Sequence, residues 1–581
     1  MIGLAQKALQ RPAAVRLVFG ALTLLAVLAA SQVRLDSDPR RLAPASPSSA
    51  EATQRHERNF PPDDTALLMI LSGPRAADLV AVVELLSQRF AELDSVKDVL
   101  SASHLPLLID GPTGFKLKPA VGSKKGLEGS LSDRLNQLRE HPVGRRLVSA
   151  DHQHFALALR LDTRYRDPVA ALPLLESLEA DIKGLLKADM RFRFAGLLAT
   201  RIQSVRSTLS DMLLLFPIAG FLVFVFLWWQ LGRLGLALAL MTTLGWSVLA
   251  TLGFAGLVGF DLNPLTQIFP ILLMIIGVAD GIHLIEAVRE ADPADHVVDR
   301  WRQSLAGAGA ACLLTTLTTV VGFLSLLITR IPLLHDFAWL VSFGLVMALI
   351  ANLCLLPSLC VLAGPPPAGK VGPLSRFCGA LAGLGYRRAV GTFALGLLVF
   401  AAAAVQLRAL EVDFFFSRML DASDSVSQGN QRLDTSLGGF IPLELSVRAT
   451  KGSFRDPEPL RQLEVLTQEG AQAMGLSLSY STVLKELKRN LGEGTALPNS
   501  RAEIAQLELL LEDAPFEALV THSRREARVV LSGVDRGSQD HLRVKRRLEA
   551  RAETLDQVEA SLVGSMVAAA EGFGALVTEL L

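Results

Sequence analysis

Cysteine is scarce in this sequence, and its positions exclude two kinds of stabilisation. The chain of 581 residues contains four cysteines: Cys312, Cys354, Cys360 and Cys378. All four lie in apolar stretches or in a short basic loop, and the two long polar regions, 34–211 and 408–581, contain none. Disulfide bonds therefore cannot stabilise the polar regions. No Cys/His spacing fits a zinc site, so we expect no bound metal.

An excess of charge is also missing, as are the common nucleotide and hydrolase motifs. The 57 Lys and Arg residues balance the 57 Asp and Glu residues, so no overall basic field favours a nucleic acid as partner. The sequence has no Walker loop and no G-x-S-x-G motif. ATP is therefore not the expected energy source, and we expect neither an enzyme nor an organic cofactor.

Hydrophobic residues are abundant, at half of the chain with a mean hydropathy of +0.38. This balance is too apolar for one soluble protein and too charged for a chain wholly inside lipid, so we predict membrane spans plus sizeable soluble domains. Seven stretches are long and apolar enough to cross a bilayer as helices. They are Leu17–Val33, Met212–Trp229, Leu234–Gly259, Pro264–Val288, Ser304–Ile328, Phe337–Leu362 and Gly391–Leu407.

Basic residues beside these spans set the predicted orientation. The N-terminal tail has three basic residues and no acidic one, and the loop at 363–390 has four basic residues and no acidic one. By the positive-inside rule both are cytoplasmic, and the two long polar regions lie together on the opposite side. The first apolar run lacks a clean cleavage site, so we interpret it as an uncleaved span rather than a signal peptide. The mixed-charge segment 289–303 fits a cytoplasmic amphipathic helix and a solvated linker equally well.

Strands alternate with amphipathic helices in both polar regions, which predicts two α+β domains of the βαβ type. In the first region the predicted strands are Thr65–Ser72, Val96–Ala102, Phe155–Leu161 and Met190–Ala195. In the second they are Phe440–Ala449, Leu476–Thr482, Ala527–Val534 and Val558–Val563. The predicted order is a cytoplasmic tail and first span (1–33), a first extracytoplasmic domain (34–211), a five-span bundle (212–362), a cytoplasmic linker (363–390), a seventh span (391–407) and a second extracytoplasmic domain (408–581).

Two joints between these parts repeat in sequence. Gln32–Asp38 (QVRLDSD) parallels Gln406–Asp413 (QLRALEVD), and Arg193–Gly196 (RFAG) parallels Ser561–Gly564 (SLVG). This predicts a repeat of span, domain and five spans, followed by the start of a second copy. An eighth span would begin where the sequence ends. A truncated chain, a frameshifted gene or a transporter split into two chains would each account for that end.

The fourth predicted span carries a carboxylate at a costly depth. Asp280 lies within the apolar stretch 264–288, and a carboxylate at the centre of a bilayer costs roughly 2.5–3.5 kcal/mol on insertion scales. Gly277 and Gly281 flank Asp280 in a small-xxx-small pattern, which favours close packing of another helix. A buried carboxylate that only joins helices is the simpler interpretation. A protonatable site in a transporter is the sharper one, because intramembrane carboxylates are functional by default.

Polar residues near Asp280 are candidates for a proton relay. His283 lies on nearly the same helix face, and imidazole exchanges protons near neutral pH; a histidine bonded to a backbone carbonyl is the alternative. Thr315 and Thr319 share one face of the fifth span, and we select them as relay residues, although most threonines in such helices bond to their own backbone. Asn352 in the sixth span is interpreted as a helix contact, and Glu286 as a group that reaches water.

These motifs, in this order, resemble the resistance–nodulation–division (RND) superfamily of transporters. Ile276–Ile285 (IGVADGIHLI), followed by Arg289 and Glu290, is similar to the superfamily's fourth-span pattern, and Leu314–Leu327 (LTTLTTVVGFLSLL) to its Thr-rich, Gly-Phe fifth-span pattern. Within the superfamily the chain resembles lipid exporters of the MMPL (mycobacterial-membrane-protein-large) and hopanoid-transporter type, relatives of Patched. The resemblance covers the whole sequence, as roughly the first two-thirds of such a transporter.

The resemblance implies a function, a coupling ion and partners. Asp280 would take part in proton translocation that powers export of lipids or other hydrophobic molecules, with protons as the coupling ion. The protein would lie in a bacterial inner membrane, in contact with membrane lipids, with its N-terminus cytoplasmic and its large domains periplasmic. It would form a homo-oligomer or bind a partner chain that supplies further spans. The alternative is a non-transporting scaffold or lipid-sensing subunit, or an inactive fragment of a transporter.

Overall fold

The structure is a computed structural model that describes residues 2–34, 47–109, 116–119, 121, 129–141, 143–263, 265–292, 294–329, 331–364, 373–406, 413–439, 441–510 and 518–580. The chain forms two compact units. The helical unit comprises Met1–Leu35, Ser210–Thr329 and Leu333–Val412. The sheet unit comprises Asp36–Leu209, Arg330–Pro332 and Asp413–Leu581. Most of the repeated joint at 32–38 and 406–413 lies outside the described residues.

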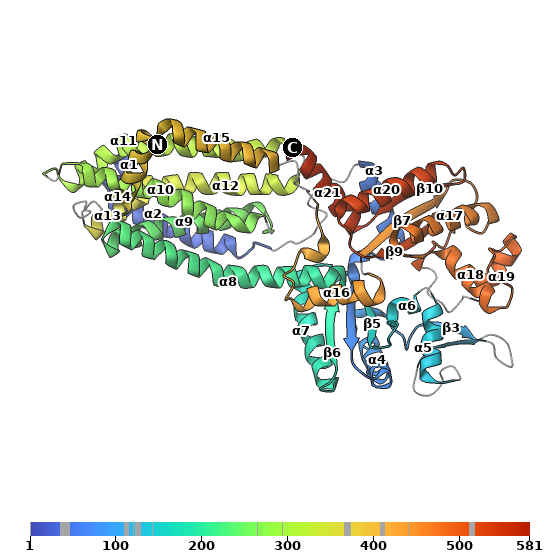
Figure 1. The fold of residues 1–581 in the computed structure, drawn as a ribbon. Helices are drawn as coiled ribbons and strands as arrows, with labels where there is room; N and C mark the ends of the chain where they lie inside the picture. Colours follow the sequence, from blue (N-terminus) through green and yellow to red (C-terminus); the bar gives the residue numbers. More distant parts are fainter. Residues whose placement is uncertain are drawn as a thin grey trace. The chain divides into compact units, whose positions relative to one another are not determined.

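Seven helices in the described ranges are long and apolar enough to cross a membrane (Figure 1). This confirms the seven spans predicted from the sequence. The helices are α2 (Pro12–Ala30), α8 (Gly196–Leu231), α9 (Leu234–Val258), α10 (Phe269–Glu290), α11 (Val297–Leu324), α12 (Pro332–Ile350), which continues through a π-helical turn (Ala351–Leu355) into α13 (Leu356–Ala363), and α15 (Ala389–Gln406). Two shorter helices are α1 (Ile2–Leu9) and α14 (Pro373–Arg387).

The segment between α10 and α11 is shorter than the sequence interpretations of residues 289–303 assumed. Helix α11 already begins at Val297, where the side chain of His296 accepts a hydrogen bond from the Val298 N–H. Trp301, within the segment interpreted as a linker or separate helix, is 1% exposed in the core of the helical unit. An N-cap and a buried indole extend α11 by about two turns into this segment, so it is not a separate amphipathic helix. The linker is limited to the described residues 291–292 and 294–296, which are mostly exposed.

Glycines allow the helices of this unit to approach closely. A Cβ atom at Gly256 of α9 would overlap the backbone of Ala29 in α2, and α2 packs along α9. In the same way, a Cβ atom at Gly277 or Gly281 of α10 would overlap the side chain of Leu244 or Leu240 in α9. Two leucines four residues apart therefore fit over two glycines four residues apart, which fixes the face that α10 presents to α9.

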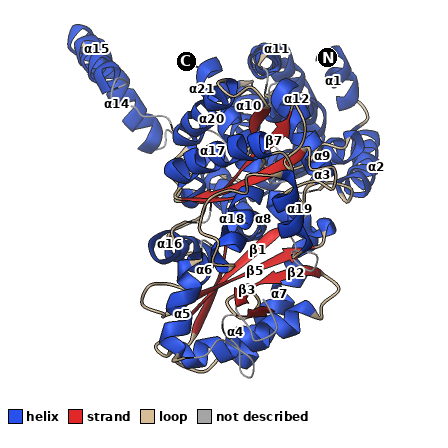
Figure 2. Cartoon of the chain, turned by 90° about the vertical axis from the view of Figure 1, so that its right-hand side faces the viewer, coloured by secondary structure: helices blue, strands red, loops and turns tan. Residues whose placement is uncertain are grey.

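The first domain of the sheet unit is a four-stranded antiparallel sheet with strand order β2-β5-β1-β6. Figure 2 shows β2, β5 and β1 side by side. Its strands are β1 (Ala66–Ser72), β2 (Val96–Leu100), β5 (His154–Leu161) and β6 (Arg191–Ala195). Its helices are α4 (Ala76–Ala91), α5 (Leu131–Glu140), α6 (Gly144–Leu147) and α7 (Pro168–Leu185), and β3 (Pro106–Ile109) pairs with β4 (Lys116–Pro119) in a small hairpin. The order is that of a split βαβ domain. The alternating pattern predicted an α+β domain of the βαβ type without assigning this order.

The second domain repeats this topology, with strand order β10-β7-β9-β8. Its strands are β7 (Ile441–Ala449), β8 (Leu476–Leu478), β9 (Glu526–Gly533) and β10 (Val558–Val563). Its helices are α17 (Pro457–Met474), α18 (Tyr480–Asn490), α19 (Arg501–Leu509), α20 (Ser538–Glu553) and α21 (Ser565–Leu580). Gly196 and Gly564, the two glycines of the repeated joint, have φ angles of +87° and +107° at the turns from β6 to α8 and from β10 to α21. These left-handed conformations favour glycine.

The two domains exchange a helix. Helix α3 (Pro47–Asn59) comes from the first polar region but packs against β10, and His56 Nε2 lies 2.7 Å from Glu444 Oε2 of β7. Helix α16 (Ser425–Leu437) comes from the second polar region but packs against β6 and β1. There, Asn430 Oδ1 accepts a 2.7 Å hydrogen bond from the Gly196 N–H. The predicted boundaries at 34–211 and 408–581 therefore follow the chain but do not say which sheet each of these helices covers.

Candidate functional site

Helix α11 lies antiparallel to α10 and donates side-chain hydrogen bonds to its backbone. The Arg300 guanidinium donates to Val288 O at 3.1 Å, and Ser304 Oγ donates to Leu284 O at 2.8 Å. Further along, Cys312 Sγ lies 3.8 Å from Asp280 O. Acceptors four residues apart on α10 meet one polar face of α11, because residues four apart lie on the same side of a helix. This row of contacts fixes the rotation of α10 about its axis and turns Asp280 toward α11.

Asp280 is 9% exposed and interacts with a hydroxyl group rather than with a cation. Thr316 Oγ1 donates to Asp280 Oδ2 at 3.3 Å, which is long for a bond between a hydroxyl and a carboxyl oxygen. Among the described residues, no Lys, Arg or His side chain forms an ion pair with Asp280. A carboxyl group in an apolar medium is less costly when it is neutral. The surroundings of Asp280 therefore allow it to hold a proton and do not fix it as an anion.

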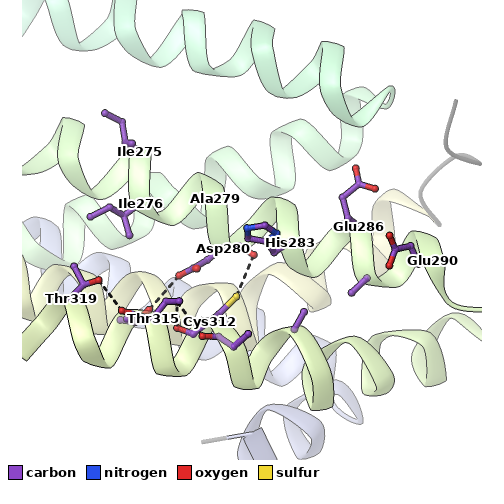
Figure 3. Close-up of a pocket in the computed structure, with 14 residues that line it drawn as sticks. Ile275, Ile276, Ala279, Asp280, His283, Glu286, Glu290, Cys312, Thr315 and Thr319 are labelled. Carbon is purple, nitrogen blue, oxygen red and sulfur yellow. Dashed lines mark hydrogen bonds between the residues drawn. The ribbon is translucent and has the colours of Figure 1, made fainter. Parts of the chain in front are cut away.

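A hollow of about 680 Å³ lies between α10 and α11 and reaches Asp280 (Figure 3). Its walls combine titratable groups, threonines and small or apolar residues. They are Ile275, Ile276, Ala279, Asp280, His283, Glu286, Ala287, Glu290, Ala308, Ala311, Cys312, Thr315, Thr316 and Thr319. The hollow brings together all four residues that the sequence selected as a relay: Asp280, His283, Thr315 and Thr319.

The contacts of the selected relay residues differ from what we expected. Thr315 Oγ1 donates to Ala311 O and Cys312 O, and Thr319 Oγ1 donates to Thr315 O, so both hydroxyls bond to their own helix. The threonine that touches Asp280 is Thr316, which we had not selected. His283 is exposed in the hollow, and its ring forms no hydrogen bond with the described residues.

A spacing rule would have identified Thr316. It lies four residues after Cys312, which in turn follows Ser304 and Arg300 at multiples of four. Each step of four turns the side chain by about 40°, so Thr316 and Cys312 lie on nearly the same side of α11. Of the pair that we selected, Thr315 lies about 100° and Thr319 about 60° round the helix from Thr316. The repeat of polar residues at intervals of four was visible in the sequence. The pattern selects Thr316 only when it is known that this side of α11 packs against α10.

The opposite side of α10 is packed for close contact. Gly277 and Gly281 lie beneath Leu244 and Leu240, and Asn352 Nδ2 donates to Gly277 O at 3.0 Å. Asn352 is fully buried in the π-helical turn and makes the helix contact expected of it. Glu286 is partly exposed and lies 2.6 Å from the Arg289 guanidinium. Within the described part of the chain, no group of three or more His, Cys, Asp or Glu side chains could hold a metal ion.

These features define a class of protein. Seven candidate spans, two split-βαβ domains placed after the first and seventh spans, and a buried carboxylate in the fourth span are features of a multi-pass membrane protein with the RND fold. The sequence matches the MMPL family over residues 41–373, which is more than half of the chain. The chain therefore belongs to the MMPL family.

One curated relative shares a shorter stretch. The chain is 31% identical over 120 residues to "Putative membrane protein MJ1562" of Methanocaldococcus jannaschii. The aligned part is 20% of this chain and 30% of the length of that protein. The similarity agrees with a membrane protein, and the printed description of the relative names no substrate.

Proposed function

We propose that this protein is a transporter rather than an enzyme, and that it exports lipids or other hydrophobic molecules across a bacterial inner membrane by using the proton gradient. Membership of the MMPL family supports the transporter class. The observation that carries the proton coupling is Asp280, a buried carboxyl group in a span with a hydroxyl neighbour and no ion pair to any described residue. Such a group can bind and release a proton without first breaking a salt bridge.

The proposed cycle follows from the contacts of Asp280. A neutral Asp280 can be accommodated between α10 and α11, whereas an ionised one requires water or a donor to replace lost solvation. Loading and release of the proton therefore favour different arrangements of the two helices. Helix α8 runs without interruption from Gly196, after the last strand of the first sheet, to Leu231 in the helical unit. It is a continuous element through which a change among the spans can act on the extracytoplasmic domains.

The substrate path and the partners belong to the same proposal. In it, the α+β domains form the path for the hydrophobic substrate on the periplasmic side, and the N-terminus is cytoplasmic. His283 carries the polar lining of the hollow outward, and an exposed imidazole facing lipid alone is costly. A second copy of the chain or a partner chain with further spans would cover this polar face.

The experiment compares buried and exposed polar groups of the same two helices. Asp280→Asn and Thr316→Val are reconstituted in proteoliposomes beside the wild-type protein, and export of a fluorescent phospholipid is followed after a pH gradient is imposed. We expect Asp280→Asn to reduce gradient-driven export to background and Thr316→Val to slow it. Thr318→Val is the matched control, because the Thr318 hydroxyl is exposed and donates to Thr315 O in its own helix.

Two outcomes would contradict the proposal. Gradient-driven export by Asp280→Asn at the wild-type rate would remove proton coupling through this residue. Absence of any gradient-driven export of the fluorescent lipid by the wild-type protein, alone and as a homo-oligomer, would favour the alternative of a non-transporting scaffold or lipid-sensing subunit.

A further inference from the structure

We propose that Asn352 is a positioning residue for the proton of Asp280. The ionised Asp280 carboxylate accepts a hydrogen bond from Thr316, and the protonated carboxyl group instead donates one to Asn352 Oδ1. This exchange of partners can be measured on the protein itself, whereas its use in transport rests on the function proposed above. Neither the family match nor the description of the relative assigns a role to Asn352.

The side-chain amide of Asn352 has one end that is bonded and one that is not. Asn352 is fully buried, and its Nδ2 donates to Gly277 O at 3.0 Å. Since a backbone carbonyl only accepts hydrogen bonds, the NH2 group must face Gly277 and Oδ1 must point elsewhere. Oδ1 has no hydrogen-bond partner among the described residues. A buried acceptor without a donor is costly, so a neighbouring group that gains a donor would be held there.

The sixth span packs along α10 in register. A Cβ atom at Gly344 of α12 would overlap the side chain of Leu273, and one at Gly277 would lie 3.8 Å from Ala348 Cβ. The two rows therefore advance together by four residues in each helix. Asn352 follows Ala348 by four residues and is the next member of the row. Because carbonyl groups point toward the C-terminus of a helix, its bond to Gly277 O places the amide beside the following turn of α10.

Asp280 belongs to that turn and faces the same row. Leu273 precedes Asp280 by seven residues, or two helical turns, so both lie on nearly the same side of α10. Leu273 in turn faces Gly344 of the sixth span. From the other neighbouring helix, α11, Thr316 Oγ1 reaches Asp280. The carboxyl group thus lies at the seam between α11 and the sixth span, where rotation about its side-chain bonds carries an oxygen from Thr316 toward Asn352.

A proline explains why the sixth span has a π-helical turn at this level. Pro357 has no N–H, and its ring would collide with the carbonyl group four residues earlier, at Leu353. The wider turn at Ala351–Leu355 ends just before Pro357 and so accommodates it. Turns of this kind occur frequently at functional sites. Here the turn places the only side-chain amide of the sixth span against α10.

The elements around the π-helical turn contain few titratable groups besides Asp280. Helix α9 has no charged residue, and α2 has only Arg16, which donates to Ser358 O. Lys7 of α1 is exposed. The remaining titratable side chains that face this region either line the hollow or are thiols, which are weak donors. They are His283 and Glu286 of α10, Cys312 of α11, and Cys354 and Cys360 of the sixth span.

Proton binding changes the hydrogen bonds that Asp280 can form. An ionised carboxylate only accepts hydrogen bonds, whereas a protonated carboxyl group also donates one. The threonine and serine hydroxyl groups of α9 all donate to carbonyl groups of their own helix, so they do not serve Asn352 Oδ1. The proton of Asp280 is therefore the available donor. Its binding moves one hydrogen bond of Asp280 from α11 to the sixth span.

Infrared difference spectroscopy tests this exchange in the full-length protein. The protein is reconstituted in liposomes, and difference spectra are recorded between steps of pH. The C=O band of protonated Asp280 is identified by its loss in Asp280→Asn. We expect Asn352→Leu to lower the pH midpoint of this band, because the protonated form loses its acceptor, and Thr316→Val to raise it, because the ionised form loses its donor. Each shift should be about half a pH unit or more, a several-fold change in proton affinity.

Ser342→Ala is the matched control for Asn352→Leu. Ser342 lies in the same span, is 4% exposed, and its Oγ also has no hydrogen-bond partner among the described residues. It precedes Gly344 by two residues and so points about 160° away from the side that meets α10. Ser342→Ala should leave the midpoint unchanged. Asn352→Ser, whose hydroxyl both donates and accepts, should restore part of the midpoint, and it replaces Asn352→Leu if that variant does not reach the membrane.

An unchanged midpoint in the Asn352 variants, or shifts in the same direction for Asn352→Leu and Thr316→Val, would overturn the exchange. The pH dependence of lipid export tests its use. Asn352→Leu should move the pH of half-maximal export together with the infrared midpoint, whereas an equal loss of rate at every pH would overturn the positioning role. Export by Asp280→Asn at the wild-type rate would instead remove the function on which that role rests, while opposite infrared shifts would still establish the exchange of hydrogen bonds.

Discussion

The two α+β domains of the sheet unit have the same strand order, but the second buries a charge cluster around Glu508 in addition to the pairs that Glu444 forms with Arg528 and His56. In the first domain, Asp64 is fully buried and lies 2.7 Å from the Arg166 guanidinium and 3.2 Å from that of Arg201. In the second, Glu508 is 5% exposed and lies 2.7 Å from the Arg524 guanidinium, and it also accepts a 2.7 Å hydrogen bond from Tyr480.

The register of the strands places these clusters. Leu68 in β1 pairs with Ala195 at the end of β6, so Asp64, just before β1, lies where α8 leaves the first sheet. In the second sheet, Val563 at the end of β10 pairs with Glu444 near the start of β7. The Glu508 cluster includes Arg524 before β9 and Arg455 after β7, so it lies at the end remote from α21.

The placement of these buried ion pairs determines how each domain is joined to the helix that follows it. Arg201 is itself a residue of α8, so an ion pair ties the base of that helix to the first sheet. At the base of α21, the inward residues Met566, Val567, Ala569 and Ala570 are apolar and buried, and the ion pair of α21, Glu571 with Lys545, joins it to α20 rather than to a strand. Broken ion pairs leave uncompensated buried charges, whereas apolar surfaces slide at lower cost. We therefore expect the base of α8 to move with the first sheet as one body, whereas the ion pair of α21 holds that helix to α20.

The largest expected effect comes from removal of either buried carboxylate. Asp64→Asn and Glu508→Gln each leave buried guanidinium groups without their anion, and loss of one partner of such a pair costs about 3–5 kcal/mol. Hydrogen exchange of the purified full-length protein should locate the loss. It should lie in the first turns of α8 for Asp64→Asn, and in α19 and β9 for Glu508→Gln. Exchange at the base of α8 that is equal in both variants would break the comparison.

The next largest effect is a loss of stability in acid, caused by His141 near the contact between the two domains. Burial, together with the nearby Arg489, lowers the pKa of His141 from 6.5 to about 4, and its Nδ1 accepts a hydrogen bond from the Val143 N–H. The unfolded chain therefore binds a proton at higher pH than the folded one. Stability is full above about pH 6.5 and falls as the pH drops toward 4, by about 2–3 kcal/mol in all.

The test of this window is His141→Gln. The variant should lose the change in unfolding free energy between pH 6.5 and 4 and keep the loss at lower pH. At that lower pH, carboxylates such as Glu508 take up protons. Burial alone would raise the pKa of Glu508, but hydrogen bonds from Arg455, Tyr480 and Arg524 lower it below its usual value. Thermal unfolding of the two proteins at a series of pH values measures both parts. If the unfolding free energy of His141→Gln still changes between pH 6.5 and 4 as it does in the wild type, other groups cause that change.

A repeated serine motif provides a smaller contrast. Ser101 follows β2 and forms a 2.8 Å hydrogen bond with Ser87 of α4, and Ser479 follows β8 and forms a 2.9 Å hydrogen bond with Thr467 of α17. Ser479 also caps α18 in a capping box with Thr482. Ser101→Ala should cost about 0.5–1.5 kcal/mol, and Ser479→Ala about 1–2 kcal/mol because a helix cap is lost as well. Equal costs, measured by chemical unfolding, would show that the cap contributes nothing.

The helices and strands of this fold differ in how well the sequence predicted them. Spans and strands depend on composition and periodicity within one stretch, so β1 and α9 begin within one residue of the predicted starts at Thr65 and Leu234. The alternation of strands and helices predicted α+β domains of the βαβ type, whereas the order of the strands in each sheet came from the structure. The exchange of α3 and α16 did not, because their sequences record an apolar face but not the sheet that covers it. Three-dimensional contacts of this kind are decided by the whole fold.

The candidate site likewise contains residues that the sequence identified and one that it did not. Asp280 and its flanking glycines were found because a carboxylate in an apolar run conflicts with its local surroundings. The hydroxyl that contacts Asp280 was assigned to Thr315 or Thr319, whereas Thr316 makes the bond. Four threonines within five positions differ only in the helix face that they occupy. The face that meets α10 was set by Arg300 and Ser304, more than ten residues away in the sequence.

The smallest expected effect concerns exposed charge pairs on an edge strand of each sheet and its neighbour. Asp98 and Arg160 face each other across β2 and β5 at 3.7 Å, and Glu559 and Arg448 across β10 and β7 at 2.7 Å. All four side chains are exposed, so each pair contributes about 0–1 kcal/mol, less at high salt. Asp98→Asn and Glu559→Gln should therefore change the unfolding temperature little, and 1 M salt should remove the change. If either variant loses as much stability as Asp64→Asn or Glu508→Gln, burial is not what separates strong from weak charge pairs in this protein. The contrast drawn between the two ends of the sheets would then rest on sequence position alone, and the firm joint inferred at α8 would lose its physical cause.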